Sequence, residues 1–201
     1  ASWKISDRVP IHFGLILFLQ AGLFGTFTAL NFFHWFLFWE LSLIPAFFLI
    51  RLWGGQGRAS AATQFFIYTM VGSVGLLLAF LAIYLATGKF DFTELAEIGR
   101  SGMLSATLSQ KLGWDATTSN RLALVIFAAA LLGFAVKVPL FPFHTWLPAA
   151  YSEASTGTAM LLTGLMSKMG VYGFIRVLSP IFPREMHSIL PLLLWLAVFT
   201  I

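Results

Sequence analysis

The sequence predicts an all-α polytopic membrane protein, and three observations lead to that fold class. Of its 201 residues, 59% are hydrophobic and only 10% are charged, whereas soluble domains carry roughly 25% charged residues. The mean hydropathy is +0.87. Apolar runs of about 20 residues, the length that crosses a bilayer as a helix, recur along the chain. We therefore expect five transmembrane helices and a truncated sixth in one membrane domain over residues 1–201.

The composition also excludes several classes of protein. Cysteine is absent, so disulfides, cysteine metal sites and iron–sulfur ligation are ruled out. The net charge of +4 comes without a basic cluster, which argues against nucleic acid as a partner. No metal-ligand spacing, Ser–His–acid order or phosphate loop stands out. Because the chain begins at Ala1 and ends at Ile201 inside an apolar run, we expect it to be part of a longer protein.

The first three helices are predicted at residues 11–30, 32–53 and 64–86. The first two follow each other almost directly, so they form a tight antiparallel hairpin, and Pro45 is expected to kink the second. A longer extramembrane loop, 87–121, mixes acidic and basic residues. Residues 92–100 within it have the pattern of a short surface helix.

The later helices are predicted at residues 122–141 and 157–178, and the truncated sixth at 188–201. The fourth is unusual, because LLGFAVKVPLFPFHTWLP (131–148) places Lys137, Pro139 and Pro142 inside apolar sequence. Proline removes a backbone donor and disrupts the preceding helical turn. The sequence therefore predicts one discontinuous helix near Lys137–Pro142.

Such a break has a functional and a structural interpretation. Discontinuous membrane helices mark ion and substrate sites in transporters. They survive where the freed carbonyls face protein or a water-filled cavity. A packing kink is the alternative, because single prolines are common in membrane helices.

Three ionisable residues fall within the predicted helices: Glu40, Lys137 and Lys168. At a rise of 1.5 Å per residue, Glu40, Lys137 and Lys168 lie roughly 12, 22 and 16 Å from the first residue of the predicted helix that carries each of them. All three are therefore in the middle part of a hydrocarbon core about 30 Å thick. Each charge costs at least about 2.5 kcal/mol at that depth. A row of charges at mid-depth is what a proton or ion path would use.

The three residues suggest a relay. Burial lowers the proton affinity of a lysine, and a nearby carboxylate restores it. Glu40 would modulate Lys137, the switched carrier, and Lys168 would be the next acceptor. Static pairs that fix helix packing are the alternative interpretation. The small residues around Lys168 also favour close helix packing.

His144 follows Lys137 by seven residues. It titrates near neutrality, which makes it a candidate relay group at the mouth on the amino-terminal side of the membrane. A hydrogen-bonded structural role is equally compatible with its position.

Three stretches carry a family resemblance: FWELSLIPAFFLI, FAVKVPLFPFHTWLP and LLTGLMSKMGVYGF. With them the whole chain resembles the antiporter-like proton-pumping subunits of respiratory complex I, NADH:quinone oxidoreductase, and among these the chain M or mitochondrial chain 4 type. The resemblance implies about fourteen helices in two inverted five-helix bundles. The present chain would be the first bundle, helices 4–8, and the start of helix 9.

The resemblance also assigns roles. It makes Glu40 the acid of helix 5, Lys137 the lysine of the broken helix 7 and Lys168 the helix 8 position, with His144 in the connecting stretch. It implies a proton-translocating subunit without a redox centre or cofactor of its own. FMN, iron–sulfur clusters and quinone are expected in partner subunits, and neighbouring antiporter-like subunits, lipid and protons are the other partners. The implied location is the bacterial inner (plasma) membrane, with the amino-terminal side cytoplasmic.

This chain departs from the family pattern at three positions. The usual HTWLPDAH-like run reads HTWLPAAY, so Ala149 and Tyr151 replace an acid and a histidine, and Gln64 stands where a lysine is common. Alternative functions remain open: a subunit of a multi-subunit cation/proton antiporter, the membrane arm of a hydrogenase-type complex, or a purely structural subunit.

Overall fold

A computed structural model describes residues 2–3 and 5–200; Ala1, Lys4 and Ile201, the last residue of the predicted sixth helix, lie outside the described residues. Apart from one isolated bridge, the regular structure of these described residues is helical. In chain order the elements are α1 (Val9–Thr28), α2 (Phe32–Leu41), α3 (Leu43–Trp53), α4 (Arg58–Thr87), α5 (Phe92–Arg100), α6 (Met103–Leu112), α7 (Ala116–Lys137), α8 (Trp146–Glu153), α9 (Thr156–Leu161), the π-helical η1 (Leu162–Met166), α10 (Ser167–Gly173), the π-helical η2 (Phe174–Leu178), α11 (Ser179–Ile181) and α12 (Pro183–Thr200).

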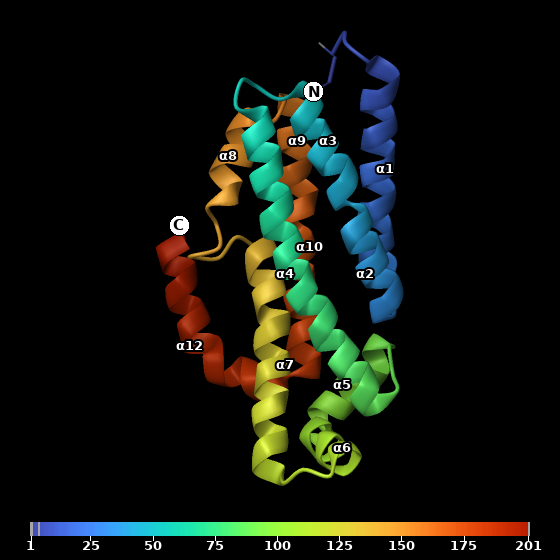
Figure 1. The fold of residues 1–201 in the computed structure, drawn as a ribbon, viewed down its shortest axis with the longest axis vertical. Helices are drawn as coiled ribbons and strands as arrows, with labels where there is room; N and C mark the ends of the chain where they lie inside the picture. Colours follow the sequence, from blue (N-terminus) through green and yellow to red (C-terminus); the bar gives the residue numbers. More distant parts are fainter. Residues whose placement is uncertain (1, 4, 201) are drawn as a thin grey trace.

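Five helical stretches of the described residues are long and apolar enough to cross a membrane. They run along the long axis of the molecule, with α5 and α6 at one end and the α3–α4 turn at the other (Figure 1). The α7 span is the most buried and the α1 span the least. The described spans are Val9–Thr28, Phe32–Trp53, Arg58–Thr87, Ala116–Lys137 and Thr156–Ile181.

Three of the predicted helices have corrected boundaries. The third helix begins at Arg58 rather than at 64, and the fourth runs from Ala116 to Lys137 rather than from 122 to 141. The sixth begins at Pro183 rather than at 188. All three helices start earlier because polar and charged residues continue a helix where its end lies outside the hydrocarbon region. The fourth helix ends earlier because Pro139 disfavours the α conformation of the residue before it, Val138.

The helix predicted at 32–53 is divided at Ser42 into α2 and α3. Pro45 lacks the backbone donor that would bond Leu41, and its ring crowds that carbonyl. The Ser42 hydroxyl donates to the Trp39 carbonyl at 2.7 Å. The helix is therefore interrupted about one turn ahead of Pro45, where a kink was expected.

Close helix packing brings α4 against α7. A Cβ on Gly72 would lie 2.9 Å from the Val136 Cβ, and one on Gly133 would lie 2.7 Å from the Gly72 carbonyl oxygen. Glycine at these crossings lets the two backbones approach, as in other membrane bundles. This close packing holds the carboxyl end of α7, which carries Lys137, at the centre of the molecule.

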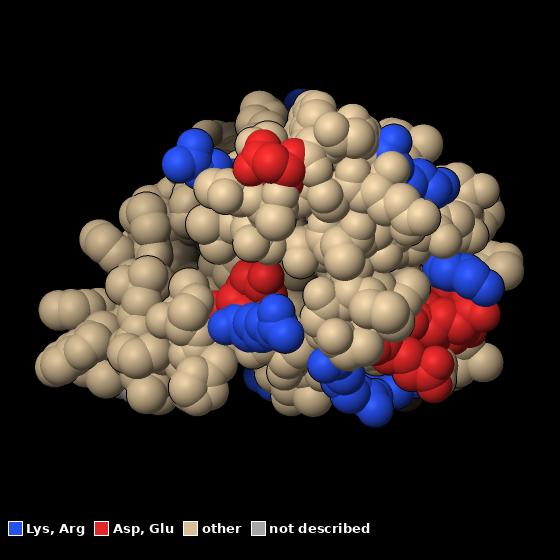
Figure 2. All heavy atoms as spheres, turned by 90° about the horizontal axis from the view of Figure 1, so that it is seen from below, with Lys and Arg blue, Asp and Glu red and all other residues tan. Residues whose placement is uncertain are grey.

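The segment predicted as an extramembrane loop contains α5, which spans the residues of the predicted surface helix, and α6. Asp91 caps α5, its carboxylate accepting from the backbone N–H groups of Thr93 and Glu94. Asn31 and Asp91 form the isolated antiparallel bridge, which ties the α1–α2 turn to this segment. Seen from this end, acidic and basic side chains lie close together among uncharged ones (Figure 2).

Candidate functional site

The break that follows α7 places Lys137 in the interior. Its side chain is only 4% exposed, although it is the last residue of the helix. Eight residues, 138–145, turn the chain before α8 begins at Trp146. The Trp146 indole donates to the Val136 carbonyl at 3.0 Å. A side chain thus satisfies one of the carbonyls that the break leaves without a helical partner.

The α2 side of Lys137 holds an aromatic ring and a carboxylate. The Lys137 ammonium lies 5.0 Å from the centre of the Trp39 ring, a distance at which a cation and an aromatic face attract each other. Glu40 interacts electrostatically with Lys137. No direct ion pair joins the two in the described part of the chain. The two charges therefore interact through space rather than in a direct ion pair.

Ser73 on α4 connects this group. The Trp39 indole donates to the Ser73 hydroxyl at 3.1 Å, and Ser73 is also a polar neighbour of the half-buried Glu40. Because a hydroxyl both donates and accepts, Ser73 can hold the indole and the carboxylate together.

On its other side Lys137 borders a small cavity. About 10 Å³ of it is open to the centre of a water molecule, which is roughly room for one. Two hydroxyls, from Tyr151 on α8 and Ser167 on α10, also line it. The rest of the lining is apolar or aromatic: Phe65, Trp146, Leu162 and Met166.

Lys168 lies just beyond that cavity and is exposed. Its ammonium donates to the Thr163 carbonyl and to the Ser167 hydroxyl, both at 3.4 Å. The π-helical segment η1 immediately precedes α10; such single-turn bulges occur often at functional sites. Lys168 therefore lies beside the Lys137 site but does not reach it directly.

The helix that carries Lys168 also packs closely, as the alternative interpretation expected. A Cβ on Gly170 would lie 2.6 Å from a methyl carbon of Val138, and one on Gly173 would overlap the Phe134 ring. Glycine at these positions holds α10 against the end of α7. The face of α10 that packs against α7 is therefore also the face that lies near Lys137.

His144 lies in the connecting turn, half-buried and stacked on Phe141 with ring centres 5.6 Å apart. Its Nδ1 is buried and has no hydrogen-bond partner among the described residues. Nearby, Thr145 donates to the Tyr68 hydroxyl at 2.7 Å and Gln64 donates to the Thr145 carbonyl at 3.3 Å. His144 is next to the break, and no hydrogen bond among the described residues connects it to Lys137.

The structure thus gathers Glu40 and Lys137, places Lys168 one step away, and leaves His144 at the edge. Sequence reasoning missed the serines, because serine is ordinary in membrane helices. The two signals that could have found them are weak. Ser73 follows Gly72 at the close crossing of α4 and α7, and Ser167 directly precedes Lys168.

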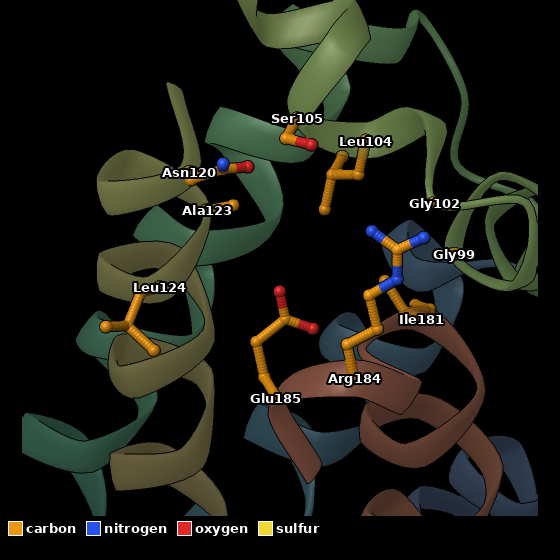
Figure 3. Close-up of a pocket in the computed structure, with 10 residues that line it drawn as sticks. All are labelled: Gly99, Gly102, Leu104, Ser105, Asn120, Ala123, Leu124, Ile181, Arg184 and Glu185. Atoms are coloured by element: carbon orange, nitrogen blue, oxygen red, sulfur yellow. The ribbon is translucent and has the colours of Figure 1, made fainter. Parts of the chain in front are cut away.

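Elsewhere, a larger polar cavity lies at the end of the molecule that holds α5 and α6. In Figure 3 the Glu185 carboxylate and the Arg184 guanidinium both point toward it from the start of α12, with Ser105 and Asn120 across from them. It is distant in the fold from Lys137 and shares no lining residue with that site. No group of three or more potential metal ligands occurs in the described residues.

Comparisons with known proteins agree on one family. The sequence profile described as "NADH:quinone oxidoreductase/Mrp antiporter, TM" matches residues 29–201. NAD(P)H-quinone oxidoreductase chain 4 1 of Picosynechococcus is 37% identical over 100% of this chain and 35% of its own length. NADH-quinone oxidoreductase subunit M of Rickettsia bellii is 36% identical over 99% of this chain and 37% of its own length. The chain thus spans little more than a third of these relatives.

Solved structures give the same answer for the fold. Respiratory complex I from Thermus thermophilus aligns with a TM-score of 0.75 and 32% identity, covering 95% of this chain and 38% of the matched chain. The Mrp complex from Dietzia aligns with a TM-score of 0.68 and 25% identity, covering 84% and 29%. The antiporter-like bundle predicted from the sequence motifs is confirmed.

Proposed function

This chain belongs to the NADH:quinone oxidoreductase/Mrp antiporter transmembrane family, and from that premise we propose that it is part of a proton-translocating membrane subunit of an NADH:quinone oxidoreductase. The observation that carries the proposal is Lys137, buried at the end of a broken helix and coupled to Glu40 without a direct ion pair. An ionisable residue inside a membrane bundle that is neither exposed nor locked in a pair is suited to moving a proton.

The mechanism follows from the two partners available to Lys137. When the Glu40 carboxylate is near, it stabilises the ammonium form, and Lys137 holds its proton. When Glu40 moves away or is neutralised, burial favours the neutral amine, and the proton leaves. The kink at Ser42, two residues after Glu40, gives α2 a place to move without disturbing α3. Trp39 keeps an attractive face beside the ammonium during the change.

In this proposal Lys168 accepts the proton from Lys137, and His144 links the relay to the amino-terminal side of the membrane. The chain supplies no redox centre of its own. FMN, iron–sulfur clusters and quinone would be held by partner subunits, and neighbouring antiporter-like subunits would be its contacts in a bacterial plasma membrane. Quinone reduction elsewhere in the complex would then drive the Glu40–Lys137 switch.

The test uses the full-length chain in its assembled complex. We expect Glu40→Ala and Lys137→Ala each to reduce proton translocation to background while the complex still assembles and oxidises NADH. A pH-sensitive dye in sealed vesicles reports translocation, and quinone reduction reports electron transfer. A normal proton-to-electron ratio in either variant would falsify the mechanism.

A cation/proton antiporter subunit is the second candidate, because the family description includes Mrp antiporters and the Dietzia Mrp complex shares the fold. The two functions differ in what drives transport. Proton movement that requires an electron donor and ignores sodium supports the first. Sodium-driven proton exchange in liposomes without any electron donor would support the second.

A further inference from the structure

We propose that the hydroxyls of Tyr151 and Ser167, with one water molecule between them and Lys137, form the bridge along which a proton passes from Lys137 to Lys168. This inference rests on the proposed function and names the groups that complete its relay. One of the two bridging residues, Tyr151, occupies the position at which the family pattern has a histidine.

The cavity supplies the first half of the bridge. Lys137, Tyr151 and Ser167 are its polar lining residues, and its other lining residues are apolar or aromatic. A buried water needs two to four polar partners and about 10–15 Å³ for its centre. The three side chains provide the partners, and the cavity of about 10 Å³ provides the space. A single water there would touch the donor of the proton on one side and a hydroxyl on the other.

The second half of the bridge runs through Ser167. Ser167 is a polar neighbour of the Tyr151 side chain, and the Lys168 ammonium lies 3.4 Å from the Ser167 oxygen. In the observed arrangement Ser167 donates to the Thr163 carbonyl at 2.8 Å. Because a hydroxyl proton rotates freely about its C–O bond, the Ser167 proton can turn from this carbonyl toward a new acceptor.

The helix geometry explains why these groups meet. η1 precedes Ser167 directly, so the chain enters α10 with one residue more in its turn than an α-helix has. Gly170 then brings α10 against Val138, immediately after Lys137. The close approach places Ser167 at the cavity, while the next residue, Lys168, is exposed and does not line it.

The proton transfer balances without any further reactant. The Lys137 ammonium gives a proton to the water, which passes one of its own to a hydroxyl oxygen. That hydroxyl releases its original proton toward the neutral Lys168 amine. One N–H bond breaks at Lys137 and one forms at Lys168, and the water and hydroxyls return to their starting composition after reorientation. A tyrosine ordinarily ionises near pH 10, so Tyr151 exchanges protons and does not store charge as a histidine would.

The experiment compares variants of the full-length chain in its assembled complex. We expect Tyr151→Phe and Ser167→Ala each to slow proton translocation severalfold, and the double variant to slow it at least tenfold. Ser167→Thr keeps a hydroxyl and should remain near wild type. Tyr172→Phe is the matched control, because its hydroxyl donates to the Phe27 carbonyl on α1 and neither residue lines the cavity.

A further variant tests the bridge independently of the hydroxyl variants, in case those variants fail to fold. Leu162→Phe fills the cavity without removing a hydroxyl, and it should slow translocation at least fivefold if the water is required. Wild-type translocation rates in the double variant or in Leu162→Phe would overturn the bridge. If those variants pump normally while Lys137→Ala does not, the bridge alone fails. If Lys137→Ala also pumps normally, the proposed function fails.

Discussion

At the scale of single residues, the site depends on a buried lysine and on small polar groups that surround it. Glu40 and Lys137 could be predicted from the sequence, because a charge inside an apolar run is costly and therefore conspicuous. Ser73 and Ser167 could not, since their importance comes from contacts between helices far apart in the chain. Which partners a lysine has is a property of the tertiary packing.

Ser73 offers a test at this scale. Ser73→Ala removes the acceptor of the Trp39 indole, and an unsatisfied buried donor costs about 1–3 kcal/mol. We expect a lower melting temperature of the purified full-length protein and a severalfold loss of proton translocation, because Glu40 also loses its neighbour. Ser73→Thr should restore both, and Ser60→Ala, exposed on the same helix, should change neither. Normal translocation in Ser73→Ala would show that Glu40 needs no support from α4.

At the scale of helices, apolar length predicted the number and order of the spans, while their ends and interruptions depended on other forces. The predicted fourth helix stopped too late, because proline ended it at Lys137. The division at Ser42 was anticipated from Pro45. The π-helical segments η1 and η2 carry no signal in a single sequence, because they arise from how one helix fits against another.

The contact between α7 and α10 gives a prediction for one of those helices. A methyl group at Gly173 would overlap the fully buried Phe134 ring. Overpacking of this kind costs about 1–3 kcal/mol, so Gly173→Ala should lower the thermal stability of the purified protein. Gly164→Ala is the control on the same membrane span, since nothing lies within 4 Å of a Cβ there. Equal stability of the two variants would contradict the close packing of α10 against α7.

The cap of α5 predicts a pH dependence outside the membrane. The backbone N–H of Thr93 donates to the Asp91 carboxylate and lowers the pKa of that group. A carboxyl whose folded pKa is lowered stabilises the helix above its ordinary pKa of about 3.9, and the stabilisation is lost as the pH falls through the folded value. Amide hydrogen exchange in α5, corrected for intrinsic rates, should therefore rise below about pH 4. Asp91→Asn keeps an acceptor without titrating and should remove this dependence; an unchanged profile in that variant would contradict it.

At the scale of the whole molecule, the most buried span, α7, ends at the site, and the least buried, α1, is peripheral. This arrangement has a functional logic, because an ionisable group must be kept from lipid while its neighbours rearrange. The family motifs predicted the bundle as a whole. They did not predict that Tyr151 and Ser167 would share a cavity with Lys137, since two of the three positions carry no charge.

The central claim is that Glu40 and Lys137 act as one switch, and a double-variant comparison tests it most directly. The proton-to-electron ratio is measured in sealed vesicles for Glu40→Gln, Lys137→Met and the combination, each in the assembled complex. Residues that work as a unit are strongly non-additive. We predict that both single variants lose translocation and that the double variant is no worse than Lys137→Met. A normal ratio in either single variant, or losses that simply multiply in the double, would contradict the account.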